Sequence, residues 1–474
     1  MLIKAAEEER HRGKGKMNMG NHDEMNIQHL LNTTQDNDSK VDVLFLSELG
    51  MWPADQGFRV HGCQMIRALC EQGVRVRMAS LRATEGAPGW LEQVRVTWPI
   101  ATDQDEAAFR SGWKGKFGWL REKVASHQAV RMNEFAGAAR LVRELKPKVV
   151  IALGQHGPLM LKGLEKAYPA VKRIWYAADE PVSFQLSCLR RDHRSVWKSR
   201  LRLTVIFALI EGLFARGLDG AIGVSPDDAK RLKWIGGIKR SVTIRNGVDL
   251  NTFDVGDHGT LPRSVVFWGR MDFDPNVDAM KWFVNEVWGE LKGRAPDATL
   301  HIVGKNPTLS IRLLRGKAGV EVLGEVDDIR PYARTASLVI LPMRCGAGIK
   351  NKLLEGAAMG LPMVVSDQAV RGLEVDADES PYVVARNREA WVEQIWSLWH
   401  DPVARMKVSQ NARQWVERHH NWKDAAMKLV GFMNGMLEGK DWIEVQNSTP
   451  DIQNINNHKP ASDQENDGGL RQAA

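Results

Sequence analysis

Short apolar segments alternate with helical segments along most of the chain, and the alternation occurs twice. The first run predicts a helix at Gly57–Glu71 and strands at Val41–Ser47, Val74–Ala79, Val149–Leu153, Arg173–Ala177 and Gly220–Val224. The second run predicts a helix at Val277–Leu291 and strands at Val265–Trp268, Ala298–Val303, Val320–Leu323, Leu338–Leu341 and Met363–Val365. Apolar strands that alternate with helices indicate parallel sheets joined by crossover helices.

The repeated alternation predicts an α/β protein with two Rossmann-like domains facing a central cleft. We expect an N-terminal domain over residues 41–255 and a C-terminal domain over residues 256–435, which the length of 474 residues allows. Residues 1–40 and 436–474 are rich in polar side chains and are predicted to be disordered tails. Open parallel sheets bind ligands beyond the carboxyl ends of their strands, so the cleft is the expected site.

The formal net charge is +7 and the pI is about 9.1. This charge fits acidic ligands such as nucleotide diphosphates, an anionic membrane surface, or ordinary solubility. The basic residues are scattered and no nucleic-acid-binding motif occurs, so we expect no nucleic acid partner. The four cysteines form no CxxC pair, which argues against a zinc site and fits a reducing cytosol.

One apolar segment, Leu203–Phe214, follows a basic stretch over residues 190–202. It is shorter than the roughly 20 residues that span a bilayer. A buried helix beside a solvated segment is the favoured interpretation, and peripheral contact with an anionic membrane is the alternative. The first forty residues contain no apolar core typical of a secretory signal. We therefore expect a cytoplasmic protein, with peripheral association at the inner membrane face left open.

The most informative segment, residues 342–362, reads PMRCGAGIKNKLLEGAAMGLP. A predicted strand enters a loop with Gly346 and Gly348, and a helix is predicted over Ile349–Met359. Glycines let a ligand approach the backbone, and a helix N-terminus offers free N–H groups. The segment therefore suits a diphosphate, although a tight turn before a surface helix is the alternative.

Two charged residues of this segment strengthen the ligand hypothesis. Lys350, predicted in the first helical turn, opposes the helix dipole unless an anion is bound. Glu355 lies about one and a half turns into the predicted helix, where its carboxylate is placed to accept hydrogen bonds from ribose hydroxyls.

This segment resembles the retaining glycosyltransferases of family 4, which carry LLEAMACGLPVV where this chain has LLEGAAMGLPMVV. The resemblance extends over residues 41–435. It implies a GT-B fold, a nucleotide diphosphate sugar as donor substrate with no further cofactor, no metal, and retention of anomeric configuration. Glu355 matches the second of two glutamates in the family, whereas the first, which contacts the transferred sugar, is replaced by Ala347. The pattern GAGIKNKLLE is similar to a subgroup with G-x-G-x-K/R-x-K-x-L-E, so we interpret the chain as a variant enzyme.

The segment VVFWGR, residues 265–270, is similar to the family's strand that ends in Gly-Arg. The resemblance implies that Gly269 and Arg270 bind the donor diphosphate, a task for which the planar guanidinium is suited. The family often has a lysine five residues later, where this chain has Pro275. Lys350 is predicted to supply that charge.

Asp272-Phe273-Asp274 has the form of a metal-binding DxD motif. It is followed by Pro275-Asn276, which predicts a turn and a helix start. We therefore predict no metal site there.

In the first domain, the segment WPADQG ending at Gly57 is similar to a family loop near the donor phosphate. His156 and Asp179 each follow a predicted strand and are candidates for contact with the reacting groups. Family members often place a histidine near the second position, and the acidic pattern here is similar to exopolysaccharide sugar transferases. An ordinary strand-to-helix loop and a structural histidine are the alternatives.

These residues predict a glycosyltransferase that moves a sugar from a nucleotide sugar to a hydroxyl of a glycan or lipid-linked acceptor, in exopolysaccharide or cell-envelope glycan synthesis. Arg270, Lys350 and the amides around Gly348 would take the charge of the leaving diphosphate. Alternatives are another GT-B enzyme, such as a nucleotide-sugar 2-epimerase, and a non-catalytic nucleotide-binding protein. An oxidoreductase is disfavoured because no G-x-G-x-x-G follows the first strand.

Overall fold

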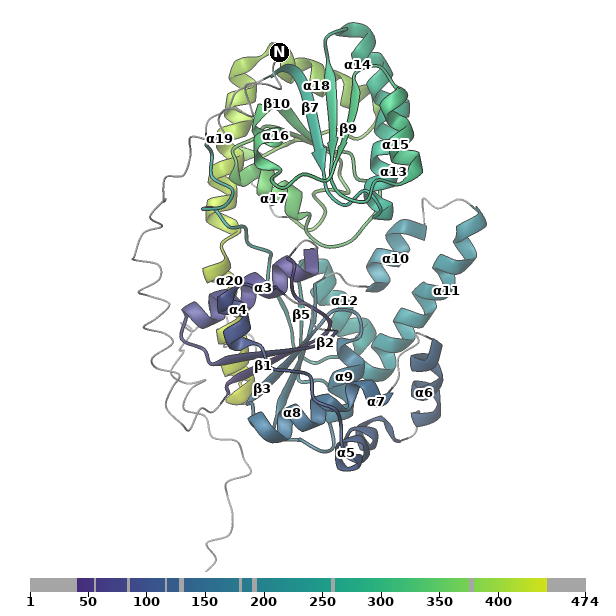
Figure 1. Ribbon diagram of the computed structural model, residues 1–474, viewed down its shortest axis with the longest axis vertical. Helices are drawn as coiled ribbons and strands as arrows, with labels where there is room; N and C mark the ends of the chain where they lie inside the picture. The colour runs from purple at the N-terminus through teal and green to yellow at the C-terminus, as the bar shows by residue number, and fades with distance from the viewer. Residues whose placement is uncertain are drawn as a thin grey trace, which may run out of the picture. The chain divides into compact units, whose positions relative to one another are not determined.

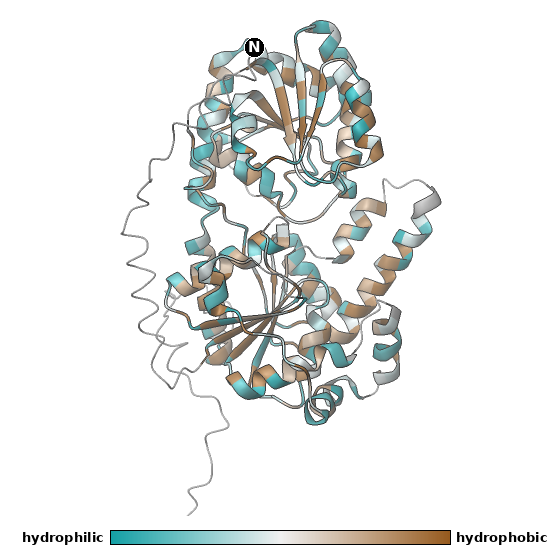
Figure 2. Ribbon diagram, in the orientation of Figure 1, coloured by the Kyte–Doolittle hydropathy of each residue, from teal (hydrophilic) through white to brown (hydrophobic). Residues whose placement is uncertain are grey.

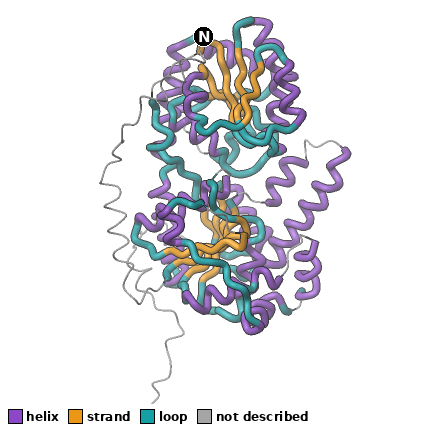
Figure 3. The backbone as a smooth tube through the Cα atoms, viewed as in Figure 1, coloured by secondary structure: helices purple, strands orange, loops and turns teal. Residues whose placement is uncertain are grey.

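The computed structural model describes residues 41–54, 57–82, 86–115, 117–127, 132–178, 181–189, 194–256, 261–373, 375 and 379–440. The two predicted tails lie outside these ranges, apart from residues 436–440. Within the described residues, two parallel sheets of six strands are interleaved with helices (Figures 1 and 3).

The first sheet has the order β2-β1-β3-β4-β5-β6. Its strands are β1 Val43–Leu49, β2 Val76–Arg82, β3 Val149–Leu153, β4 Lys172–Ala177, β5 Gly220–Gly223 and β6 Ser241–Thr243. The associated helices are α3 Gly57–Glu71, α4 Gly89–Val94, α5 Asp103–Trp113, α6 Gly118–His127, α7 Met132–Phe135, α8 Gly137–Leu145, α9 Gly157–Leu164, α10 Pro181–Leu189, α11 Arg194–Ile210 with a π turn Glu211–Ala215, and α12 Pro226–Gly236.

The second sheet has the order β12-β11-β10-β7-β8-β9. Its strands are β7 Leu261–Trp268, β8 Thr299–Val303, β9 Val320–Gly324, β10 Ala336–Leu341, β11 Met363–Val365 and β12 Val383–Val384. Its helices are α13 Asp274–Trp282, a π segment Phe283–Trp288, α14 Gly289–Arg294, α15 Leu309–Arg312 with a 3₁₀ turn Leu313–Gly316, α16 Arg330–Thr335, α17 Asn351–Ala358, α18 Arg388–His400 and α19 Pro402–His419. A last helix, α20, covers Trp422–Leu437.

Both sheets are buried on both faces, which explains why their strands are continuous apolar runs. In β1, Leu44 and Leu46 pack into one core while Val43 and Phe45 pack into another, because successive side chains point to opposite faces. Figure 2 shows the strands as strongly hydrophobic and the helices as mixed. Among the described residues, no helix is long and apolar enough to cross a bilayer.

The last helix, α20, packs in the core of the first sheet. Trp422, Leu429 and Phe432 contact the same cluster as Val43 and Phe45, and α20 lies against α3. The sequence analysis assigned residues up to 435 to the second domain, whereas α20 packs with the first. The pattern of apolar residues shows that a helix has an apolar face, but it does not show which core that face joins. The chain therefore passes into the second half and returns.

The predicted elements agree with the structure to different degrees. The strands Val149–Leu153 and Met363–Val365 and the helix Gly57–Glu71 are confirmed at both ends. The continuous helix predicted at Val277–Leu291 is wrong in detail, since α13, a π segment and α14 share this region. The short edge strands β6 and β12 were not predicted, because three and two residues carry little periodic signal.

Candidate functional site

Strand order determines where each sheet is open to a ligand. In the second sheet, β7 lies between β8 and β10, so the connections that follow β7 and β10 leave toward opposite sides. In the first sheet, the same reversal lies between β1 and β3. Ligands of open α/β sheets bind beyond the carboxyl ends of strands at such reversals. A ligand is therefore expected at the loops that follow β7, β10, β1 and β3.

The loop after β7 holds Arg270 in a fixed orientation. Gly269 has a φ of 142°, a conformation that side chains disfavour. Arg270 donates two hydrogen bonds to Asp272, with Nε–Oδ1 2.9 Å and Nη2–Oδ2 3.1 Å. These bonds from Arg270 lower the pKa of Asp272. Asn276 Nδ2 donates to the Arg270 carbonyl at 2.8 Å, so the loop is tied to α13.

The loop after β10 contains the two predicted glycines, both in left-handed conformations. Gly346 has a φ of 110° and Gly348 a φ of 67°. The Gly346 amide donates to Ser187 Oγ at 2.8 Å, and Gln368 Nε2 donates to the Gly346 carbonyl at 2.7 Å. The loop is therefore held from two sides.

Lys350 lies one position before the helix rather than in its first turn. It is the N-cap of α17, and its Nζ donates to the carbonyl oxygens of Ala347 and of Gly348, the latter at 3.0 Å. The sequence placed the helix start two residues early, which is within the usual uncertainty of helix ends. In this structure the amine supports the loop by binding its carbonyl groups. The side chain of Ile349 is 7% exposed and packs in the core, so only its backbone can meet a ligand.

Glu355, in α17, contacts Trp268, the last residue of β7. Its Oε2 accepts a hydrogen bond from Trp268 Nε1 at 2.7 Å. Burial raises the pKa of Glu355, and the bond from Trp268 opposes that rise. The carboxylate already has one protein donor, which leaves its other oxygen for a ligand hydroxyl.

Lys352 is a residue of this site that the sequence analysis did not single out. Its Nζ donates to Asn276 Oδ1 at 2.7 Å and lies 4.0 Å from the centroid of the Phe267 ring. A Cβ atom added to Gly269 would lie 2.9 Å from this nitrogen, so the amine touches the loop of Arg270. Burial lowers the pKa of Lys352 to about 7. The sequence feature that could have identified Lys352 is its position in the GAGIKNKLLE pattern, two residues after Lys350.

At the reversal of the first sheet, His156 meets Glu48. Glu48 belongs to β1, and His156 follows β3 as the N-cap of α9. His156 Nδ1 donates to Glu48 Oε2, and this bond lowers the pKa of Glu48. Because a carboxylate only accepts, Nδ1 carries the proton. His156 is 6% exposed, and its Nε2 has no protein partner among the described residues. Glu48 was missed because one acidic residue at a strand end carries no motif.

Of the two remaining predicted site residues, Gly57 lies within the described residues and Asp179 does not. Gly57 begins α3, and a Cβ atom there would lie 3.9 Å from Asn351 Nδ2, at the start of α17. Asp179 lies outside the described residues.

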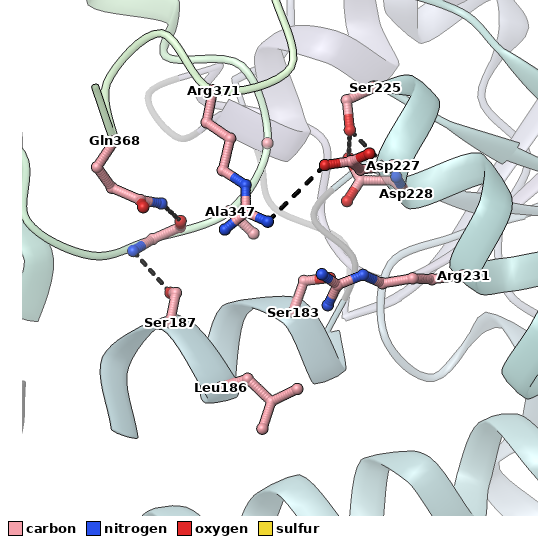
Figure 4. A pocket seen from close by; sticks show the side chains of 12 residues that line it. Ser183, Leu186, Ser187, Ser225, Asp227, Asp228, Arg231, Ala347, Gln368 and Arg371 are labelled. Atoms are coloured by element: carbon pink, nitrogen blue, oxygen red, sulfur yellow. Dashed lines mark hydrogen bonds and ion pairs between the residues drawn. The ribbon is translucent and has the colours of Figure 1, made fainter. Parts of the chain in front are cut away.

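A pocket opens beside the glycine loop (Figure 4). Arg371 lies 3.8 Å from Asp227 at its edge, and the Arg231 side chain extends beside Ser183. The lining comprises Ser183, Leu186, Ser187, Ser225, Asp227, Asp228, Arg231, Gly346, Ala347, Gly348, Gln368 and Arg371. Of the predicted site residues, Gly346 and Gly348 line this pocket, whereas Arg270, Glu355 and His156 do not.

Both aspartates of the DxD sequence bind arginines. Asp272 pairs with Arg270, and Asp274 with Arg200. Among the residues that the structure describes, no three His, Cys, Asp or Glu side chains gather as a metal site would require.

Known proteins resemble this chain in sequence and in fold. Residues 262–401 match the family described as Glycosyl transferases group 1. Sucrose-phosphate synthase from Thermosynechococcus elongatus superposes with a TM-score of 0.62 at 13% identity, covering 84% of this chain and 100% of that chain. HepE from Anabaena, solved in complex with UDP, gives a TM-score of 0.53 at 12% identity over 83% and 100%. WaaG, a glycosyltransferase involved in lipopolysaccharide biosynthesis, gives 0.53 at 13% over 81% and 98%.

These comparisons define the class of the protein. The two parallel sheets form a GT-B fold, as the sequence predicted. The match of residues 262–401 to Glycosyl transferases group 1 supports a glycosyltransferase with this fold. The matched residues contain Arg270, the glycine loop, Lys352 and Glu355.

The buried carboxyl of Glu355 predicts a gain in stability when its charge is removed. We expect Glu355→Gln to raise the thermal midpoint at pH 7 by about 2–4 °C, the shift that roughly 1 kcal/mol produces in a domain of 150–250 residues. The amide oxygen can still accept from Trp268, whereas the desolvated charge is absent. Because the folded pKa is raised above 4.5, the gain should shrink as the pH falls toward 4.5.

Melting curves between pH 4.5 and 8 measure this effect. The exposed Glu389→Gln serves as a control, since its side chain is 70% exposed. A lower midpoint for Glu355→Gln at pH 7 would contradict the assignment of a destabilising buried charge.

Proposed function

We propose that this glycosyltransferase uses a nucleotide diphosphate sugar as donor and binds the diphosphate at the reversal of the second sheet. The observation that carries the proposal is that Arg270 follows β7 and the Gly346–Gly348 loop follows β10, two adjacent parallel strands that end at this edge, inside the residues that match the family. Asp272 orients the Arg270 guanidinium before any ligand arrives. Such preorganised cations and amides stabilise a leaving diphosphate without reorganisation during the reaction.

We propose further that transfer retains the anomeric configuration and needs no dedicated metal. The first proposal is supported by the LLEGAAMGLPMVV segment, which resembles that of retaining enzymes of family 4. The second is supported by the engagement of Asp272 with Arg270, which already neutralises that carboxylate. HepE was solved with UDP, which supports uridine nucleotides as the first donors to test.

Substitution of Arg270 tests the donor site. We expect Arg270→Ala to lower kcat/KM at least a hundredfold, because loss of one preorganised donor to a developing charge typically costs about 10²–10³ in rate. The assay follows transfer from UDP- and GDP-sugars to polyprenyl-linked and glycan acceptors, with the anomeric configuration of the product read by NMR and EDTA added in parallel. Arg294→Ala, which removes another partly exposed arginine held by two glutamates, is the matched control.

Retained activity of Arg270→Ala would refute this site. Release of a free epimerised sugar without an acceptor would instead favour the epimerase alternative. Nucleotide binding with neither transfer nor release would favour a non-catalytic protein.

We propose that His156 and Glu48 contact the acceptor hydroxyl at the reversal of the first sheet. Glu48 fixes the ring through Nδ1. The other ring nitrogen, Nε2, is buried and has no hydrogen-bond partner among the described residues, so it is the ring atom left to bind a hydroxyl. A carboxylate that orients an imidazole in this way is a common arrangement for proton transfer.

Substitution of this pair should separate transfer from donor binding. We expect His156→Ala to lower the rate of transfer about 10²–10³-fold with UDP affinity unchanged, since general acid–base groups contribute about 10²–10⁴-fold. Glu48→Gln, which removes the charge but keeps an oxygen that can accept from Nδ1, should give a smaller loss. Calorimetry with UDP and transfer assays measure the two quantities. Loss of UDP binding in His156→Ala would place the residue in the donor site instead.

We also propose that the protein works in the cytoplasm and contacts an anionic membrane surface through α11. Four apolar side chains spaced four residues apart are exposed on this helix, namely Trp197, Leu201, Val205 and Leu209. Lys198 and Arg202 are exposed beside them, while Phe207 and Ile210 pack in the core. An apolar stripe flanked by cations is typical of interfacial helices. The sequence interpretation favoured a buried helix, and the structure shows one buried and one exposed face.

Membrane contact can be measured by flotation with phosphatidylglycerol vesicles. The unmodified chain should float with these vesicles, and less so at high salt or with phosphatidylcholine alone. Val205→Asp should abolish flotation, because it places an anion in the apolar stripe. Val403→Asp changes an exposed valine on α19 and is the control. Equal flotation of both variants would contradict the proposal.

A further inference from the structure

Four charged side chains line the pocket beside the glycine loop, and they differ in how far other groups already neutralise them. Asp228 is 4% exposed and accepts a hydrogen bond from Ser225 Oγ at 2.6 Å, at the N-terminus of α12, where the helix dipole favours an anion. Asp227 and Arg371 form an ion pair of 3.8 Å, and both side chains are more than half exposed. Arg231 has no ion-pair or hydrogen-bond partner among the residues that the structure describes. This arginine is therefore left without a neutralising carboxylate there.

The direction of Arg231 is informative because its own helix offers an ion-pair partner that it does not use. Asp227 precedes Arg231 by four residues in α12, the spacing at which opposite charges pair along a helix. Asp227 pairs instead with Arg371, which follows β11. The Arg231 side chain extends beside Ser183 of α10, and both arginines reach into the pocket (Figure 4). Two cations from different elements thus converge on one pocket.

The rest of the lining suits a sugar. Ser183 and Ser187 contribute hydroxyl groups, and Leu186, which is 39% exposed, contributes an apolar surface. An apolar wall with a few polar groups is typical of sites for small ligands. Ala347 of the glycine loop lines the same pocket and carries no charge. A planar guanidinium forms two parallel hydrogen bonds with a carboxylate or a phosphate, so the two arginines select a sugar that carries such a group.

We infer that this pocket binds a carboxylate or phosphate substituent of a sugar, through Arg231 and, as the second cation, Arg371. The substrate class is therefore a hexuronate or a phosphorylated sugar. The inference rests on the proposed function, because it names the sugar that is held beside the loop of the proposed donor site. Asp227 holds Arg371 at the pocket edge until the anion arrives, and an exposed pair of this kind costs little to open. The charged sugar is either the transferred sugar or the acceptor, and the experiment separates these two sources.

Calorimetric titration of the full-length chain with matched neutral and anionic sugars tests the pocket. The donor pair is UDP-glucuronate and UDP-glucose, or GDP-mannuronate and GDP-mannose where only GDP binds. The acceptor set is methyl glucuronide, glucose 6-phosphate and the neutral methyl glucoside, each titrated with the free nucleotide already bound. We expect an anionic member of the pair or of the set to bind about tenfold or more tightly than its neutral counterpart, because charge-assisted bidentate hydrogen bonds are stronger than neutral ones.

Substitution of Arg231 shows whether this pocket causes the preference. Arg231→Gln should reduce the preference about fivefold or more and leave the affinity for the free nucleotide unchanged, because Arg231 is not among the residues assigned to the diphosphate. Lys230→Gln makes the same charge change at the neighbouring exposed position of α12, and this matched control should keep the preference. Arg231→Lys, which keeps the charge but loses the planar fork, should fall between the two. If Arg231→Gln does not fold, Arg371→Gln carries the same expectation.

The outcomes separate the pocket from the donor site. A preference below about tenfold in both the donor pair and the acceptor set, or one that Arg231→Gln reduces less than about fivefold, overturns the inference, while nucleotide binding leaves the proposed function intact. A preference in the donor pair that the variant loses assigns the charge to the transferred sugar, and one in the acceptor set assigns it to the acceptor. Either of these results supports the inference. Failure of the unmodified chain to bind UDP and GDP overturns the proposed function as well.

Discussion

The reversal of strand order in each parallel sheet is the constraint on which the site depends. Parallel strands all end at the same edge of their sheet. Where the strand order reverses, the two neighbouring connections pass over opposite faces of the sheet, and a gap opens between them. In the second sheet this gap lies between β7 and β10, and it receives Arg270 and the glycine loop from two different connections. In the first sheet it lies between β1 and β3, and it receives Glu48 and His156. Residues far apart in sequence meet because topology brings their strand ends together.

Around the second gap, the protein keeps polar groups in a desolvated environment and loses stability by doing so. The end of β7 contributes Trp268 to this environment, and α17 contributes Lys352 and Glu355. Burial favours the neutral form of both ionisable groups, because it lowers the pKa of Lys352 and raises the pKa of Glu355. A preorganised site of this kind accepts a charged ligand with little rearrangement, which is why strained or unfavourable charges gather at functional sites. The neighbouring pair Arg270–Asp272 is partly exposed and contributes little to stability, so orientation of the guanidinium is its main effect.

Much of the fold and part of the candidate site could be predicted from the sequence. The remainder depends on the direction in which side chains point and on strand order. The apolar runs of Val149–Leu153 and Met363–Val365 predicted the strands, because both faces of a parallel strand are buried. The motif predicted the glycine loop, whose positive φ values only glycine adopts readily. It could not show that Lys352 donates to Asn276 while Lys350, two residues earlier, donates to carbonyl oxygens of its own loop. It also could not pair Glu48 with His156, because their contact depends on strand order rather than spacing.

The return of the chain through α20 joins the two halves at a second place. The chain crosses between them after β6 and again before Trp422, and these crossings are bonded to each other. Val248 N donates to the His420 carbonyl at 3.0 Å, and His420 Nδ1 lies 2.6 Å from the Asn246 carbonyl oxygen. Burial lowers the pKa of His420 to about 4, so the ring stays neutral near pH 7 and the link does not respond to pH there. The two crossings are therefore bonded to each other. Asn246 also donates to Asn351 at the start of α17, so the first crossing is bonded to the helix that carries Glu355 as well as to the second crossing.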